Sequence, residues 1–141
     1  VRGHWVIDSY FNMEKSPLHD GWFPTGDVAT IDADGYMQIT DRSKDVIKSG
    51  GEWISSVELE NELIAHPAVL EAAVVGVPDE HLGQEVAAAV ALRPGAVASA
   101  DDIREYVREQ IAGYKYPRVV WIRESLPKGP TGKILRRELR P

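Results

Sequence analysis

Short apolar runs separated by turn residues predict two hairpins in the first part of the chain. Residues 29–31 and 36–39 flank Asp32-Ala33-Asp34-Gly35, and residues 46–48 and 52–54 flank Ser49-Gly50-Gly51. Asp and Gly tolerate the backbone angles of tight turns, so both stretches are typical of hairpins. Residues 5–7 also predict a short strand, although a polar, irregular stretch follows them.

The rest of the chain alternates between strand and helix patterns. Ser55 followed by Glu58 indicates a capping box and predicts a helix with an inward face, which ends near Pro67; the inward residues are Val57, Leu59, Leu63 and Ile64. Ser99 with Asp102 predicts a second helix, with Tyr106 beside its inward residues Ile103, Val107 and Ile111. Residues 69–77, 86–92 and 119–122 predict buried strands, and residues 134–139 a final short helix.

These elements predict an α+β fold in two parts. A polar connection, Asp41-Arg42-Ser43-Lys44, lies between the two hairpins and is where we expect a domain boundary. Beyond it we expect a small domain that contains a hairpin and a roughly three-stranded sheet flanked by helices.

Composition narrows the possible functions. The chain has 141 residues, 43% of them hydrophobic, which is enough for one domain or a small domain with an appendage. It has no cysteine, so disulfides and thiolate metal sites are excluded, and its four histidines lack the spacing of metal ligands. The longest apolar run, residues 86–92, is too short to span a membrane. We expect a soluble, cytoplasmic protein without a metal site, with peripheral membrane association left open.

The C-terminal segment carries the best candidate for chemistry. Leu126-Pro-Lys-Gly-Pro-Thr-Gly-Lys133 places a lysine on a Gly/Pro-rich loop. The whole chain has a formal net charge of −6, but basic side chains outnumber acidic ones after residue 100, so a basic end follows an acidic body. The spacing of Gly129 and Gly132 and the following Ile134 exclude a Walker loop. Two interpretations remain: a solvated basic tail, or a cation that meets a carboxylate or phosphate.

Several motifs occur in one order along the chain. They are Thr25-Gly26-Asp27, then the stretch from Asp41 to Ile54 that includes Lys48-Ser49-Gly50-Gly51, then Val57-Glu58-Leu59-Glu60, then the Gly-Lys segment. From about residue 21 to 139, this order closely resembles the C-terminal part of the AMP-forming acyl-CoA synthetases. Within this adenylate-forming superfamily, the version with Trp53 resembles fatty-acid–CoA ligases.

The resemblance implies a role for several residues. Asp27 would bind the ribose hydroxyls of ATP, and Arg42 would contact the ribose and phosphate side of the nucleotide. Lys44 would be the hinge about which the domain turns between two poses. From the residues alone, the alternatives are a turn or cap aspartate for Asp27 and a surface ion pair for Arg42.

The resemblance also implies two sites in the small domain. Lys133 would be the catalytic lysine of adenylation, and Lys48 would assist it; a solvated strand lysine is the equal alternative for Lys48. Gly50 and Gly51 would line the pantetheine tunnel of CoA, or form a plain hairpin turn. Trp53 would stack on a nucleotide or pack, with packing slightly favoured.

Taken together, the resemblance implies a fragment of an ATP-dependent acid–CoA ligase of fatty acid metabolism. Residues 1–41 would be the last strands of its large domain, residues 42–44 the hinge and residues 45–141 the mobile lid. The full enzyme would use a carboxylic acid, ATP, CoA and Mg2+, without nucleic acid or a transmembrane segment, and homo-oligomers are compatible with it. The fragment alone should be inactive. The alternatives are a lid that loads a carrier protein and a non-enzymatic anion-binding module.

Overall fold

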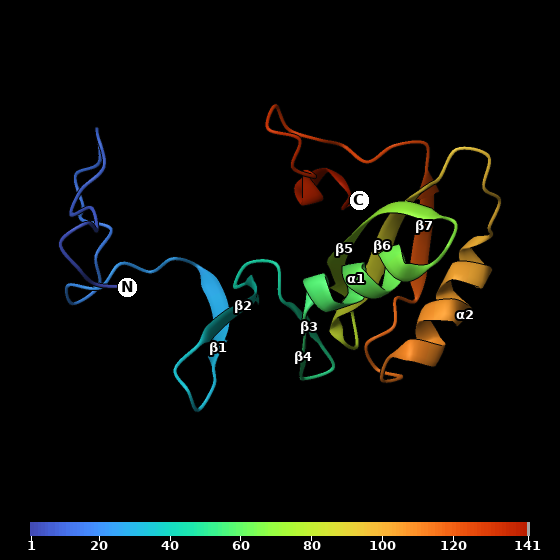
Figure 1. Ribbon diagram of the computed structural model, residues 1–141, viewed down its shortest axis with the longest axis horizontal. Coiled ribbons are helices and arrows are strands. Elements are labelled where there is room, and N and C mark those ends of the chain that lie inside the picture. Colours follow the sequence, from blue (N-terminus) through green and yellow to red (C-terminus); the bar gives the residue numbers. More distant parts are fainter. Residues whose placement is uncertain (141) are drawn as a thin grey trace. The chain divides into compact units, whose positions relative to one another are not determined.

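The chain forms two compact units, Val1–Lys44 and Asp45–Pro141. The computed structural model describes residues 1–140, and Figure 1 shows their helices and strands. The division follows Lys44, inside the polar connection singled out by the sequence. Whether that connection acts as a hinge stays a prediction.

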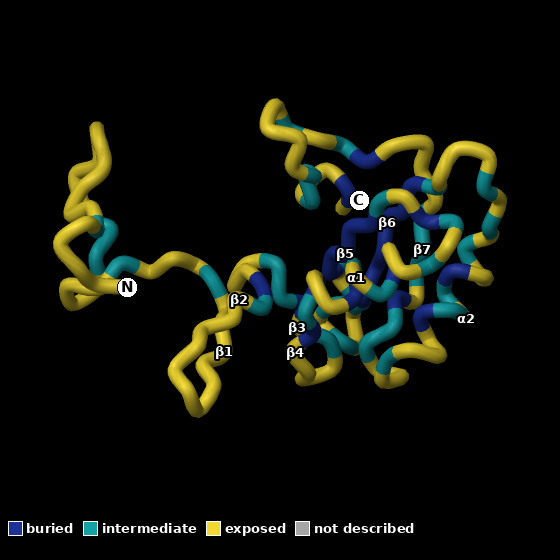
Figure 2. Tube along the Cα trace, in the orientation of Figure 1, coloured by how far each residue is buried: buried dark blue, intermediate teal, exposed yellow. Residues whose placement is uncertain are grey.

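The first unit contains one hairpin and little buried surface. β1 (Asp27–Ile31) pairs antiparallel with β2 (Met37–Arg42). In the connecting turn, the Asp32 carboxylate accepts hydrogen bonds from the backbone N–H groups of Asp34 and Tyr36. Figure 2 shows almost the whole unit as exposed.

The strand predicted for residues 5–7 is wrong. These residues form no strand, and Trp5 is 99% exposed. Three apolar residues are a weak strand signal on their own, and no described segment pairs with them, so their backbone groups gain no ladder of hydrogen bonds.

A five-stranded sheet organises the second unit. β5 (Val69–Asp79) pairs antiparallel with β6 (Gly83–Leu92), and β7 (Val119–Arg123) runs parallel to β6. The hairpin of β3 (Ile47–Ser49) and β4 (Glu52–Ile54) joins β6 at Ser49 and Gly83. The expected three-stranded sheet is thus confirmed, and the second hairpin extends it.

Both helices cover the same face of this sheet. α1 (Ser56–Ala65) packs on β5 and α2 (Ala100–Gln110) packs on β7, and their buried residues share one core cluster with Val74, Val86 and Val90. The buried apolar residues of these helices are Leu59, Leu63, Ile103 and Val107. Val57 and Ile64 were expected inward but are 37% and 43% exposed. The apolar stripe of α1 is therefore narrower than predicted, because the sheet covers only the side that carries Leu59 and Leu63.

Both predicted N-cap serines are confirmed, and the predicted capping box is complete at α2. Ser99 and Asp102 form a complete capping box at the start of α2. At the start of α1, the Ser55 hydroxyl accepts from the Glu58 backbone N–H at 3.2 Å. Both serines thereby satisfy a backbone donor that the helix itself leaves without a partner.

The C-terminal segment packs on the other face of the sheet. Leu126 and Leu139 are buried there against alanines and valines of β5 and β6, with Ile134 beside them. The predicted helix over residues 134–139 is only a short 3-10 turn, η1 (Arg136–Glu138). Ile134 and Leu135 instead use their backbones to pair with Lys128 and Pro127, which leaves too few residues for an α-helical turn.

Candidate functional site

The first unit brings Asp27 and Arg42 together. They are register partners at one end of the β1–β2 ladder, and the Arg42 Nε lies 3.0 Å from the Asp27 Oδ1. The Asp27 side chain is 21% exposed and that of Arg42 57%. An arginine and a carboxylate presented side by side can contact the phosphate and hydroxyl groups of a nucleotide.

The β3–β4 hairpin carries the second set of predicted site residues. Gly50 and Gly51 form its turn, both with positive φ (58° and 90°). A two-residue turn with positive φ at both central positions matches strand twist and favours glycine. A Cβ at Gly51 would meet nothing within 4 Å, so the turn is open on that side within the second unit.

Lys48 and Trp53 face each other across this hairpin. They are register partners, and the Lys48 ammonium lies 4.0 Å from the Trp53 ring centroid, a cation–π contact. Trp53 is 64% exposed, so its ring lies on the surface of the second unit. The alternation of the strands explains this, since the neighbouring Ile47 and Ile54 are the residues that face the core.

The loop that carries Lys133 is fixed at its base. The Gly129 N–H donates to the Lys133 carbonyl at 2.8 Å, and the Gly132 N–H donates to the Gly129 carbonyl at 2.9 Å. Gly132 has φ +78°, a conformation that glycine adopts without strain. The Lys133 side chain is exposed, and within residues 1–140 its ammonium has no ion-pair partner. The loop thus presents a free cation on an ordered backbone.

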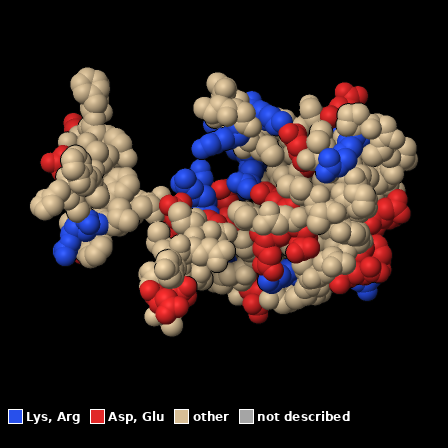
Figure 3. All heavy atoms as spheres, viewed as in Figure 1, with Lys and Arg blue, Asp and Glu red and all other residues tan. Residues whose placement is uncertain are grey.

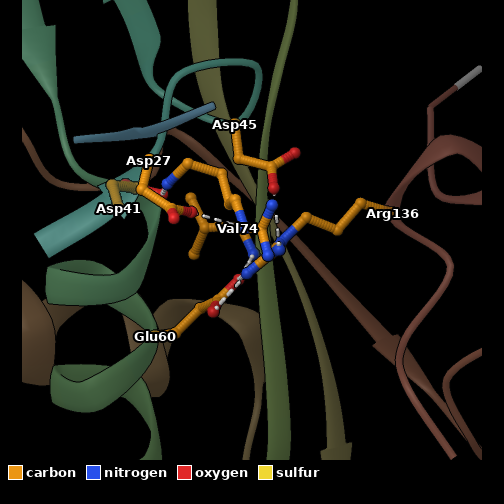
Figure 4. A network of polar contacts seen from close by, with 7 residues as sticks. Asp27, Asp41, Asp45, Glu60, Val74 and Arg136 are labelled. Carbon is orange, nitrogen blue, oxygen red and sulfur yellow. Dashed lines mark hydrogen bonds and ion pairs between the residues drawn. The ribbon is translucent and has the colours of Figure 1, made fainter. Parts of the chain in front are cut away.

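Arg136 anchors this loop to the body of the second unit. Figure 4 shows its guanidinium between Glu60 of α1 and Asp45. Its Nη2 donates to both Glu60 carboxylate oxygens at 2.8 and 2.7 Å, its Nε donates to Glu60 Oε1 at 3.1 Å, and its Nη1 donates to Asp45 Oδ2 at 3.2 Å. Glu60 also accepts from the Val74 N–H at 2.9 Å, which ties the contact to β5.

The role of Arg136 is not visible in the local sequence. Arg136 belongs to a basic segment, and its partners lie 76 and 91 positions away, so they leave no local signal. Figure 3 shows the basic side chains that gather over the C-terminal segment. In this segment Lys128 and Arg136 pair with Glu71 and Glu60, whereas Lys133 has no ion-pair partner among residues 1–140.

Two further polar contacts of the second unit shift a pKa. Backbone N–H groups of Leu82 and His81 donate to the Asp79 carboxylate and lower its pKa. The Glu58 carboxylate accepts from the Lys115 ammonium at 2.9 Å and raises the lysine's pKa. Both shifts reflect contacts that stabilise the charged form and fix the local backbone.

Lys44, the predicted hinge, is the last residue of the first unit and is exposed. Among residues 1–140, no three His, Asp or Glu side chains form a group that could hold a metal ion. No helix in the same range is long and apolar enough to cross a membrane.

Residues 58–133 match the AMP-binding enzyme C-terminal domain, and the chain belongs to this family. It is 52% identical to the 3-methylmercaptopropionyl-CoA ligase of Ruegeria pomeroyi and 46% identical to the medium-chain-fatty-acid–CoA ligase of Ectopseudomonas oleovorans. Each alignment covers 99% of this chain and 26% of the relative. The chain therefore spans about a quarter of the length of these relatives.

A solved structure agrees with this assignment. The o-succinylbenzoate CoA synthetase of Bacillus subtilis, in complex with its acyl-adenylate intermediate, superposes with a TM-score of 0.88 at 37% identity. The match covers 98% of this chain and 29% of that protein. The chain has the fold of the C-terminal lid of adenylate-forming enzymes, and its relatives are acyl-CoA ligases.

Proposed function

We propose that the protein containing this chain is an ATP-dependent carboxylic acid–CoA ligase. It forms an acyl-adenylate and then an acyl-CoA thioester. The presence of CoA ligases among the relatives supports CoA, in preference to a carrier protein, as the acyl acceptor, and family membership speaks against a non-enzymatic anion-binding module. Residues 1–41 belong to the large domain of the enzyme, residues 42–44 are the hinge and residues 45–141 are the lid.

The proposal rests on the surroundings of Lys133. Its ammonium is exposed and unpaired within residues 1–140, while the backbone around it is fixed by hydrogen bonds and by Arg136. A cation held in place in this way needs little reorganisation when negative charge develops on the substrate carboxylate and the α-phosphate. Such preorganised contacts are the main source of electrostatic catalysis.

The remaining candidates divide between the substrates. Asp27 binds the ribose hydroxyls of ATP, and Arg42, its neighbour at 3.0 Å, contacts the ribose and phosphate side. Lys48 assists adenylation. The open turn at Gly50 and Gly51 admits the pantetheine arm of CoA, and the exposed ring of Trp53 offers a surface on which a nucleotide stacks.

The acid is a fatty acid, in this proposal. The support is that one relative is named for medium-chain fatty acids and another for a short thioether acid, both acids with a flexible chain. Mg2+ accompanies the phosphates of ATP in this proposal. Because this chain supplies only part of the active site, the isolated chain has no ATP–pyrophosphate exchange activity in this proposal.

Two crossed substitutions in the intact ligase test the proposal. Lys133→Ala should slow adenylation by about 100-fold or more, the loss typical of a group that stabilises transition-state charge. It should leave thioester formation from supplied acyl-adenylate largely intact. Gly51→Leu should do the reverse, because the side chain obstructs the route of the thiol while pyrophosphate exchange continues.

Matched controls separate these effects from general damage. Arg137→Ala removes a cation from the same segment, but one whose side chain is 80% exposed. Gly35→Leu places a side chain at φ +87° in the β1–β2 turn and so reproduces the backbone strain of Gly51→Leu at φ +90°. If Lys133→Ala and Gly51→Leu depress the same half-reaction, or the controls match them, the assigned roles are wrong.

A further inference from the structure

The β3–β4 hairpin packs on the core through the buried Ile47 and Ile54, but few hydrogen bonds join it to the neighbouring strand. The paired residues between β3 and β6 are Ser49 and Gly83 alone. Next to this pair, the Gly50 N–H donates to the Leu82 carbonyl at 3.0 Å. A third contact comes from a side chain: Gln84 Oε1 accepts from the Lys48 backbone N–H at 2.9 Å.

The side chain of Gln84 reaches this position across a glycine. Gly76 lies in the interior of β5, opposite Val86, and Gln84 is two residues from Val86 along β6. A Cβ at Gly76 would lie 2.9 Å from the Gln84 Cδ and 3.0 Å from both terminal atoms of its amide. These distances are shorter than van der Waals contact, so an alanine at residue 76 would displace the amide.

Gly76 is also costly in itself as a strand residue. Glycine in a strand interior loses more conformational entropy than other residues and contributes no side chain to packing, and it often marks a close approach by another group. Here the approaching group is the amide of Gln84. The backbone of residue 76 does not require glycine for its conformation, since its φ is not positive.

We propose that Gly76 and Gln84 act together as a positioning device for the hairpin that carries Lys48, Gly51 and Trp53. Gly76 leaves the space, Gln84 occupies it, and its amide oxygen fixes the Lys48 backbone. The hairpin is thereby set at a defined angle to the sheet. The functional consequence rests on the proposed CoA-ligase activity, whereas the contact itself does not.

The structural part is tested in the 141-residue chain by hydrogen exchange of the Lys48 amide, measured by NMR without substrate. Gly76→Ala and Gln84→Ala should each lower its protection about fivefold to tenfold, the factor expected for one net hydrogen bond. The double variant should lose no more than either single variant, because alanine at residue 76 has no amide to displace when Gln84 is absent. Gln84→Glu keeps an acceptor oxygen and should restore protection to within about twofold.

Gly113→Ala is the matched glycine control. A Cβ at Gly113 would meet nothing within 4 Å and its φ is not positive, so the substitution should leave the protection of Lys48 unchanged. Additive losses in the double variant, or full protection of the Lys48 amide in Gln84→Ala, would overturn the proposal that Gly76 and Gln84 position the hairpin together. Equal loss in Gly113→Ala would overturn it too.

The functional part is tested in the intact ligase. Gly76→Ala and Gln84→Ala should slow thioester formation from supplied acyl-adenylate about fivefold, on the scale of one lost positioning contact, and Gln84→Glu should recover most of the rate. Loss of Lys48 protection with an unchanged rate would overturn the link to catalysis. A wild-type protein that forms no acyl-CoA would instead overturn the proposed function, and the exchange pattern would still decide whether Gly76 and Gln84 position the hairpin.

Discussion

Arg136→Met should destabilise the second unit, and the burial of the Arg136–Glu60 ion pair indicates by how much. The side chains of Arg136 and Glu60 are 27% and 14% exposed, so the pair lies between the exposed and the buried case. Exposed pairs contribute about 0–1 kcal/mol, and removal of one partner from a buried pair costs about 3–5 kcal/mol. We therefore expect the free energy of unfolding to fall by about 2 kcal/mol.

The loss arises mainly at Glu60. Without Arg136, its carboxylate keeps the hydrogen bond from Val74 but remains mostly buried without its guanidinium partner. For a unit of this size, about 2 kcal/mol corresponds to a fall in Tm on the order of 10 °C. Denaturant unfolding followed by circular dichroism gives the free energy, and differential scanning calorimetry gives Tm.

Arg137→Met is the matched control. It removes the adjacent arginine, which is 80% exposed and lies 3.9 Å from Glu138, and should change the free energy by less than about 0.5 kcal/mol. The companion variant Glu60→Gln should lower the cost of Arg136→Met in a double-mutant cycle, because the uncompensated charge is then gone. If Arg136→Met and Arg137→Met behave alike, the anchor assigned to Arg136 is wrong.

Two further predictions concern the Lys115–Glu58 pair and the connection between the units. The hydrogen bonds that the Lys115 ammonium donates to the Glu58 carboxylate raise the folded-state pKa of Lys115 above its ordinary 10.5, so the stability they add is complete below pH 10.5 and is lost as pH rises through the folded pKa. Lys115→Met should remove this alkaline component from unfolding curves, and an unchanged curve would contradict it. Lys44→Pro should restrict φ and hold the intact ligase in one pose, so that adenylation survives while thioester formation collapses; equal loss of both half-reactions would contradict a hinge.

The sequence determined the secondary structure of the lid closely, because its signals are local. α2 begins with a capping box of Ser99 and Asp102, and a pattern of four residues is enough to predict it. The turn at Gly50 and Gly51 needs only two residues that accept positive φ. Long apolar runs are typical of strands buried on both faces, and β5 and β6 are such strands, with cores on either side.

Tertiary structure alone decided which residues meet across the chain. Whether Val57 and Ile64 are covered depends on how much of α1 the sheet beneath it covers. The apolar pattern of the helix sequence does not show this. The predicted strand at residues 5–7 and the helix at 134–139 failed for the same reason, since pairing partners elsewhere decide whether a short segment becomes a strand, a helix or a turn.

The site shows the same division. Local sequence singled out Lys133 on its loop, because a lysine after Gly and Pro is visible within ten residues. The contacts that fix the site are not local: Arg136 meets Glu60 from 76 positions away, and Gln84 meets the Lys48 backbone from 36 positions away. Such contacts depend on strand order and register, which bring distant residues within hydrogen-bond distance, and those are properties of the folded chain as a whole.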